Sequence, residues 1–153
     1  MNKLDLTHSY EGVNYLHLAC INQNLFPLVK DLLSKGFNLN MKDKVGATAI
    51  FYAAVNPNPK ILEYILTDDS QYVRVYDTKM NTPLIMAIIA RRTDNIHFII
   101  QKVPSSVKDK SILRLTPLSV ACRNGSVATM RTLMSYAGSP PNQAGGWEKM
   151  TPL

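Results

Sequence analysis

Three histidines and two cysteines are the residues of this chain with the greatest capacity for chemistry. A histidine can act as a general acid or base, and a cysteine as a nucleophile or metal ligand, but each needs a partner at a recognisable spacing. His17 and His97 have no serine, cysteine or carboxylate so placed, and Cys20 and Cys122 form no cluster of the kind that binds zinc. We therefore expect no catalytic residue, no metal site and no cofactor in this segment.

The elements that would position these residues recur with a period of about 34 residues, which is typical of small stacked units. In the first four units, leucine or isoleucine stands two places after a register position and alanine stands five places after it. Each register residue can cap a helix, and these residues are Asn14, Thr48, Thr82, Thr116 and Thr151. The first three gaps between them are equal, and the fourth is one position longer. A second apolar set follows at helical spacing, for example Leu28, Val29, Leu32 and Leu33. Each unit is therefore predicted to be two short antiparallel helices with one buried seam, stacked against its neighbours.

This pattern resembles the ankyrin repeat, a family whose motif is roughly D-x-x-G-x-T-P-L-H-x-A-A. The third unit has a Thr-Pro-Leu run that begins at Thr82, and His17 of the first unit occupies the position of the motif histidine. Further matches in the same register are Gly12, Leu16, Ala19, Asp43, Gly46, Thr48, Ala53, Ala54, Asp77, Pro83, Leu84, Ala87, Thr116, Pro117, Leu118 and Ala121. The hairpin glycine of the motif is replaced by Met80 and Arg114 in the third and fourth units. The resemblance implies an all-α ankyrin-repeat solenoid of paired antiparallel helices with hairpin connections, in which the imidazole of His17 holds a turn.

The register also sets the expected boundaries. An N-terminal lead-in is expected at 1–8, and four units and the start of a fifth are expected at 9–42, 43–76, 77–110, 111–145 and 146–153. The fifth unit restarts the motif at Thr151 and is too short to form a helical turn. Because natural arrays normally finish with a polar-faced terminal unit, we expect the chain to continue into further repeats or another domain.

Length and composition are those of a folded domain. The chain has 153 residues, of which 46% are hydrophobic and 18% are charged, a balance that argues against disorder. The N-terminus contains no signal peptide, and no apolar stretch reaches the roughly 18 residues of a membrane-spanning helix. Cys20 and Cys122 occupy equivalent positions three units apart, too far for a disulfide, so we expect both to be free and buried. These features favour a soluble protein of the cytoplasm, which is a reducing compartment.

Positive charge is concentrated where the units begin. The formal net charge is +6, and basic residues fall in or beside the expected hairpins and after the inner helices, at Lys42, Lys44, Lys79, Lys108, Lys110, Arg114, Arg91, Arg92 and Arg123. In the ankyrin-like arrangement, hairpin tips and inner helices line one concave groove. The sequence leaves open whether these residues form a basic groove for an acidic partner or a solvated, lysine-rich surface. Apolar residues at exposed tips, such as Tyr10 and Val45, favour a partner.

The resemblance and the tip residues together predict a non-catalytic, monomeric scaffold that binds a protein or peptide partner with an acidic face. The residues expected to contact this partner are Tyr10, Lys42, Lys44, Val45, Lys79, Asn81, Ile112, Leu113 and Arg123. One alternative is an N-terminal regulatory or targeting domain of a larger enzyme, secreted effector or ion channel. A second alternative is nucleic-acid or nucleotide binding, which an isoelectric point near 9.4 suggests. It is disfavoured because the aromatic residues do not alternate with the basic tips as stacking platforms would.

Overall fold

The computed structural model describes residues 10–67 and 75–137, so the expected lead-in (1–8) and the expected start of a fifth unit (146–153) lie outside the described residues. Within those two ranges the regular structure is helical, apart from an isolated antiparallel bridge between Tyr10 and Val13. The helices are α1 (Tyr15–Ile21), α2 (Phe26–Ser34), α3 (Ala49–Val55), α4 (Pro59–Ile65), α5 (Pro83–Ile89), α6 (Thr93–Lys102), the 3-10 helix η2 (Pro104–Lys108), α7 (Pro117–Arg123) and α8 (Val127–Ala137).

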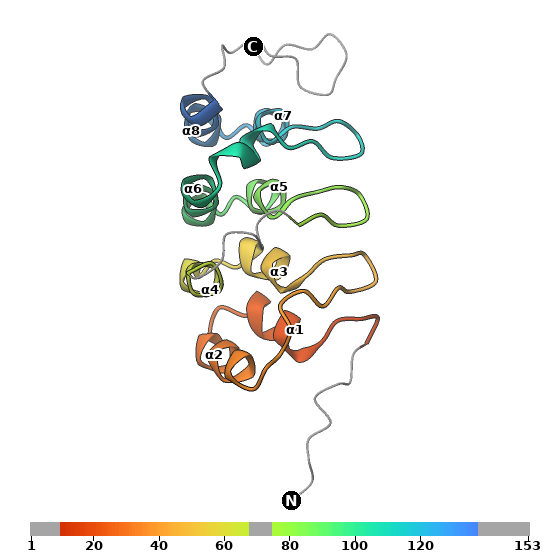
Figure 1. Ribbon diagram of the computed structural model, residues 1–153. Helices are drawn as coiled ribbons and strands as arrows, with labels where there is room; N and C mark the ends of the chain where they lie inside the picture. The colour runs from red at the N-terminus through yellow and green to blue at the C-terminus, as the bar shows by residue number, and fades with distance from the viewer. Residues whose placement is uncertain (1–9, 68–74, 138–153) are drawn as a thin grey trace, which may run out of the picture.

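The helices lie in two rows (Figure 1). The row beside the hairpin loops contains α1, α3, α5 and α7, which we call the inner helices, and the second row contains the outer helices α2, α4, α6 and α8. Each inner helix packs against its neighbours along the stack and against the outer helix that follows it in the chain. The predicted all-α solenoid of paired antiparallel helices is confirmed.

Each inner helix begins at the register position found in the sequence. Its N-cap residue has extended backbone angles in all four cases, and these residues are Asn14, Thr48, Thr82 and Thr116. The hydroxyl of Thr82 accepts a hydrogen bond from the backbone N–H of Ile85 at 3.3 Å, which satisfies one of the free donors at the helix start. The period of the sequence is therefore the period of the helix starts.

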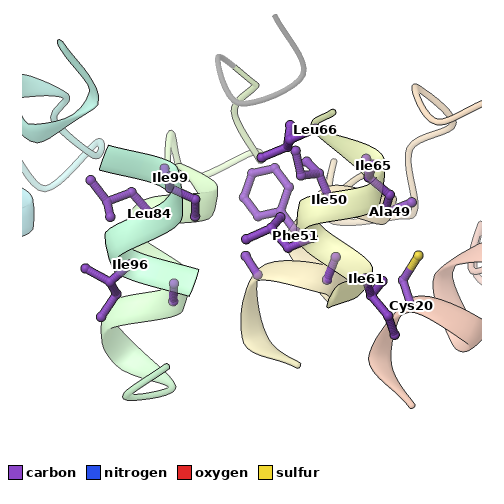
Figure 2. Close-up of a cluster of buried hydrophobic side chains, with 14 of the residues drawn as sticks. Cys20, Ala49, Ile50, Phe51, Ile61, Ile65, Leu66, Leu84, Ile96 and Ile99 are labelled. Atoms are coloured by element: carbon purple, nitrogen blue, oxygen red, sulfur yellow. The ribbon is translucent and has the colours of Figure 1, made fainter. Parts of the chain in front are cut away.

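The hydrophobic core is a cluster that runs along the stack between the two rows. Leu16, Ile50 and Leu84 stand two residues after their N-caps and are 0–2% exposed. Figure 2 shows part of this cluster, where side chains of α3 and α4 lie between Cys20 of the preceding unit and Leu84 of the following unit. The equivalent residue of the fourth unit, Leu118, is partly exposed, because no further unit covers it within the described residues.

A left-handed backbone conformation recurs in the hairpin that opens each unit. Gly12, Gly46, Met80 and Arg114 stand one period apart from one another along the chain and have φ angles of 80°, 78°, 57° and 57°. A side chain at Gly12 is excluded because its Cβ would lie 2.8 Å from the Cα of Asp43. Met80 and Arg114 adopt the same conformation with a Cβ atom present, which costs about 1 kcal/mol each relative to glycine.

Candidate functional site

Successive hairpins are joined by a ladder of backbone hydrogen bonds. The N–H of Lys44 donates to the carbonyl of Glu11, that of Thr78 to Val45, and that of Ile112 to Lys79, each at 2.9 Å. We call residues 10–12, 44–46, 78–80 and 112–114 the tip ridge. Because each tip is held by the one before it, the hairpin loops form a single ordered edge of the molecule, beside the inner helices (Figure 1).

A carboxylate at the base of the hairpin holds two of these tips in shape. Oδ1 of Asp43 accepts hydrogen bonds from the backbone N–H groups of Val45 at 2.9 Å and Ala47 at 2.8 Å. Oδ1 of Asp77, one period later, accepts the equivalent bonds from Lys79 and Asn81, both at 2.8 Å. These aspartates therefore stabilise the hairpins, and their carboxylates accept hydrogen bonds from backbone N–H groups of the same hairpin.

The structure places most of the predicted contact residues on or beside the tip ridge, as exposed side chains. Tyr10 and Leu113 are 84% and 72% exposed, and the other exposed members of this set are Lys42, Lys44, Val45, Lys79 and Ile112. Asn81 is placed differently, since it is half-buried and its Nδ2 donates to Oδ2 of Asp77 at 2.9 Å. Arg123 is exposed but lies at the end of α7, away from the tips.

The basic residues of the tip ridge differ in their surroundings. The Lys44 ammonium lies 3.1 Å from a carboxylate oxygen of Glu11, and both side chains are well exposed. Such a surface pair contributes little stability, but it offsets the charge of Lys44. Lys79 has no carboxylate within ion-pair distance among the described residues. Lys79 is therefore the clearer positive charge on the ridge.

A second exposed surface lies on the inner helices, which were expected to line the groove, although none of its residues was predicted as a contact. The inner helices of the first three units expose apolar side chains four and seven residues after their N-caps. We call this set the inner stripe, and its members are Leu18, Ile21, Tyr52, Val55, Met86 and Ile89. Leu18, Ile21 and Ile89 are 52%, 47% and 51% exposed, and the other three are half-buried. The signal in the sequence was the recurrence of apolar residues at these two register positions in three units.

The buried histidine has a structural role. Nδ1 of His17 accepts a hydrogen bond from the backbone N–H of Asn14 at 3.1 Å, so the ring proton lies on Nε2, which donates to the carbonyl of Met41 at 3.0 Å. Burial lowers the pKa of His17, and the bond to Met41 and the nearby Asp43 partly offset this. The imidazole therefore joins α1 to the connection that leads to the second unit, as the resemblance implied. His97 is exposed on α6.

The two cysteines differ in burial, and the prediction that both are buried was wrong for Cys122. Both thiols are free, but Cys20 is buried while Cys122 is half-exposed, with its Sγ 3.2 Å from the sulfur of Met130. Burial raises the pKa of Cys20 to about 12 and also raises the pKa of Cys122. The next unit covers the position of Cys20, whereas no described unit follows that of Cys122. Neither thiol has the lowered pKa of a nucleophilic cysteine.

A polar cavity of about 240 Å³ lies where the helix connections of the second and third units meet. Its lining consists of Asn56, Pro57, Arg91, Arg92, Thr93, Asp94 and Asn95. Asn95 is buried and its Oδ1 has no hydrogen-bond partner among the described residues.

In residues 10–67 and 75–137, no three histidine, cysteine, aspartate or glutamate side chains stand close enough to hold a metal ion. Every helix in the same ranges is too short or too polar to cross a membrane.

Comparisons with known proteins agree with this architecture. A family model of ankyrin repeats in three copies matches residues 16–111. The chain is 36% identical over 92 residues to the putative ankyrin repeat protein L271 of Acanthamoeba polyphaga mimivirus, covering 59% of this chain and 12% of that protein. It is 26% identical over 123 residues to the ankyrin repeat protein nuc-2 of Neurospora crassa, covering 80% of this chain and 11% of that protein. It is 29% identical over 136 residues to Rabankyrin-5 of Mus musculus, covering 87% of this chain and 11% of that protein. The chain thus spans about a tenth of the length of these relatives.

Proposed function

The chain belongs to the ankyrin-repeat family, and from this premise we propose that it is a non-catalytic scaffold that binds a protein or peptide partner with an acidic face. Ankyrin repeats generally mediate protein–protein interactions, and domains built from them are typically non-catalytic. The proposed contact surface is the tip ridge together with the exposed side of the inner helices.

The observation that carries this proposal is the exposure of apolar side chains on an ordered backbone edge. Tyr10, Val45, Ile112 and Leu113 are all more than half exposed, although hairpin tips are normally polar. The ladder of backbone hydrogen bonds already holds these tips in place. A partner would therefore bind without a large cost in ordering entropy, and aromatic and apolar anchors of this kind dominate the energetics of many interfaces.

The acidic character of the partner is supported by the charge of the tips. Lys42, Lys79 and Arg114 are exposed there, whereas Asp43 and Asp77 accept hydrogen bonds from their own hairpins. Positive charge on a surface speeds the association of an acidic partner. The long relatives, of which the chain spans about a tenth, favour a second proposal, in which this segment targets or regulates a larger protein.

Charge reversal on the ridge tests the first proposal. Proteins captured from a native lysate on the immobilised domain provide the ligand, and association rates are measured for Lys44→Glu and Lys79→Glu variants. The rate should fall strongly and lose most of its salt dependence, since screening acts over about 8–10 Å, while the melting temperature stays nearly constant. The matched controls are Lys60→Glu and Lys102→Glu, which alter exposed residues of the outer helices α4 and α6. Rates that fall equally in both pairs would reject the ridge and indicate attraction to total charge.

A further inference from the structure

The inner helices of the first three units carry few polar side chains, namely His17 and the tyrosines of α1 and α3. Their sequences are YLHLACI, AIFYAAV and PLIMAII, and none contains aspartate, glutamate, lysine or arginine. A helix of this kind is expected to be buried all round, and the outer helices, which face solvent on one side, do carry charged residues. The inner stripe is nevertheless only partly covered, since Leu18, Ile21 and Ile89 are about half exposed, so its composition points to a further layer on that side of the inner helices.

The stripe has the dimensions of one helix laid across the stack. Neighbouring packed helices stand about 8–10 Å apart, so α1, α3 and α5 carry a stripe about 20 Å long. Seven residues of an α-helix advance about 10 Å, and a helix with an apolar residue every seven positions would therefore place one on each inner helix. An extended strand presents a side chain to the same face about every 7 Å, which does not match the spacing of the units.

At the fourth unit, a basic residue takes the place of an apolar residue of the stripe. Arg123 occupies the register position held by Ile21, Val55 and Ile89 in the earlier units, and Arg91 is exposed just after α5. The inner helices, α7 included, contain no acidic residue. A ligand that covers the apolar rows would therefore meet a basic end beside α7.

We propose that the inner stripe binds one amphipathic α-helix of a partner protein, about 15 residues long, with acidic residues at the end that lies over Arg123. The helix crosses α1, α3 and α5 and buries apolar side chains at i, i+7 and i+14 against them, with further apolar residues at i+3 or i+4 on the same face. This inference rests on the proposed function and deepens it, because it separates the apolar stripe, which recognises the helix, from the tip ridge.

A displayed library of random segments of about 15 residues, selected on the immobilised domain, tests this inference. The selected segments should have apolar residues at the spacing of one helix face and acidic residues toward one end. One of them, synthesised with a fluorescent label, is then titrated with variants of the domain. Ile21→Lys and Ile89→Lys should each weaken binding at least about tenfold. Arg123→Glu should weaken the binding of the selected peptide but not of a version whose acidic residues are replaced by neutral ones.

Matched controls alter exposed apolar residues of the outer helices. Leu28→Lys on α2 and Val127→Lys on α8 should change the dissociation constant less than about twofold. Thermal melts check that the variants fold, and Leu18→Lys on α1 replaces any variant of the stripe that does not.

Three results would overturn the inference. Selected segments whose apolar residues lack a helical period, or the absence of any selected segment, would contradict a helical partner. Binding that survives Ile21→Lys and Ile89→Lys but is lost in Lys79→Glu would place the partner on the tip ridge, so that the proposed function stands without this inference. A dimer in sedimentation equilibrium that Ile89→Lys dissociates would assign the stripe to a second copy of the chain.

Discussion

At each junction between two units, side chains of the following unit donate hydrogen bonds to the free backbone carbonyls at the end of the preceding inner helix. They do so in two different ways. At the first and third junctions a single asparagine does this, because Nδ2 of Asn56 donates to the carbonyl of Cys20 at 2.7 Å and Nδ2 of Asn124 donates to that of Ile88 at 2.9 Å. These two asparagines stand two full periods apart, at the same register position. The third unit has Ala90 at that position.

At the second junction, two other residues take over the role of the missing asparagine. Nε of Arg92 donates to the carbonyl of Val55 at 2.7 Å, and Nδ2 of Asn95 donates to those of Ala54 at 2.9 Å and Asn56 at 2.8 Å. The carbonyls at the end of a buried helix must be satisfied, so the requirement persists when the residue that normally meets it is lost. The unpaired Oδ1 of Asn95 and the polar cavity beside it accompany this replacement.

The largest effect is expected from a change that breaks two junctions at once. Leu84 is fully buried on α5, which packs against both α3 and α7. Leu84→Asp would place a carboxylate without a partner in the core, at a cost of about 4 kcal/mol or more, so the cooperative thermal transition in circular dichroism should be lost. Leu118→Asp, at the partly exposed equivalent position, should leave a folded domain with a lower melting temperature. A Leu84→Asp variant that melts within a few degrees of the parent would contradict the packing described for α5.

A smaller effect is expected from removing one closing residue, and its size should differ between the junctions. Asn56→Ala leaves the carbonyl of Cys20 without its donor and should cost about 2 kcal/mol in chemical denaturation. Arg92→Ala should cost about 1 kcal/mol, because Arg92 and Val55 are only half-buried and water can replace the lost donor. Equal losses would contradict this difference between the two junctions.

The same comparison predicts a rescue. Ala90 has φ and ψ of −78° and −3°, and Asn124 has −79° and −6°. An asparagine at position 90 would therefore reach the carbonyl of Ala54, the register equivalent of Cys20 and Ile88, without backbone strain, and Ala90→Asn should restore part of the stability lost in an Asn95→Ala variant.

The first junction should also depend on pH. Burial lowers the pKa of His17 from its ordinary value of 6.5, so the unfolded chain takes up a proton at a higher pH than the native protein does. The stabilisation is complete above about pH 6.5 and decreases as the pH falls below it, by up to about 1.4 kcal/mol per pH unit, until the native pKa is passed. Urea midpoints measured between pH 7.5 and 5 should show this slope, and His17→Gln should reduce it. An unchanged slope in that variant would assign the effect to other groups.

The smallest effect is expected in the hairpins that join the units. Here one substitution should stabilise the domain, whereas most of the variants above destabilise it. Met80→Gly relieves a left-handed conformation at a residue with a Cβ atom and should stabilise the domain by about 0.5–1 kcal/mol. Gly46→Ala, in the hairpin one unit earlier, should destabilise it, because the added Cβ would lie 3.0 Å from the backbone nitrogen of Thr78. Denaturation midpoints that shift in the same direction in both variants would contradict this account of the hairpins.

The fold and the helix starts could be predicted because their determinants are local and periodic. Thr82 followed by proline encodes a helix start within a few residues, and the period of the chain repeats that signal. Exposure could not be predicted in the same way, because it depends on what packs against a residue. Cys20 and Cys122 share a register position and differ in burial because only the first is followed by a described unit. Asn81 was predicted as a contact at a hairpin tip, and its side chain is half-buried because its amide donates to Asp77.

The exposure of the inner stripe could not be predicted from the sequence for a related reason. An apolar residue on an inner helix looks like part of the core, and periodicity alone does not tell which of two apolar faces is covered. Leu16 and Leu18 are both leucines of α1, yet the first is 0% and the second 52% exposed. Whether the stripe and the tip ridge contact a partner remains a prediction.

The hydrogen bonds between successive hairpins also make cooperativity observable at single amides. The N–H groups of Lys44, Thr78 and Ile112 each belong to one unit, whereas their acceptors belong to the unit before. Hydrogen exchange at these amides therefore measures the parting of two units rather than the unfolding of either one. In a linear array, opening spreads from neighbour to neighbour. The order in which the three amides exchange would consequently record the end from which the array begins to unravel.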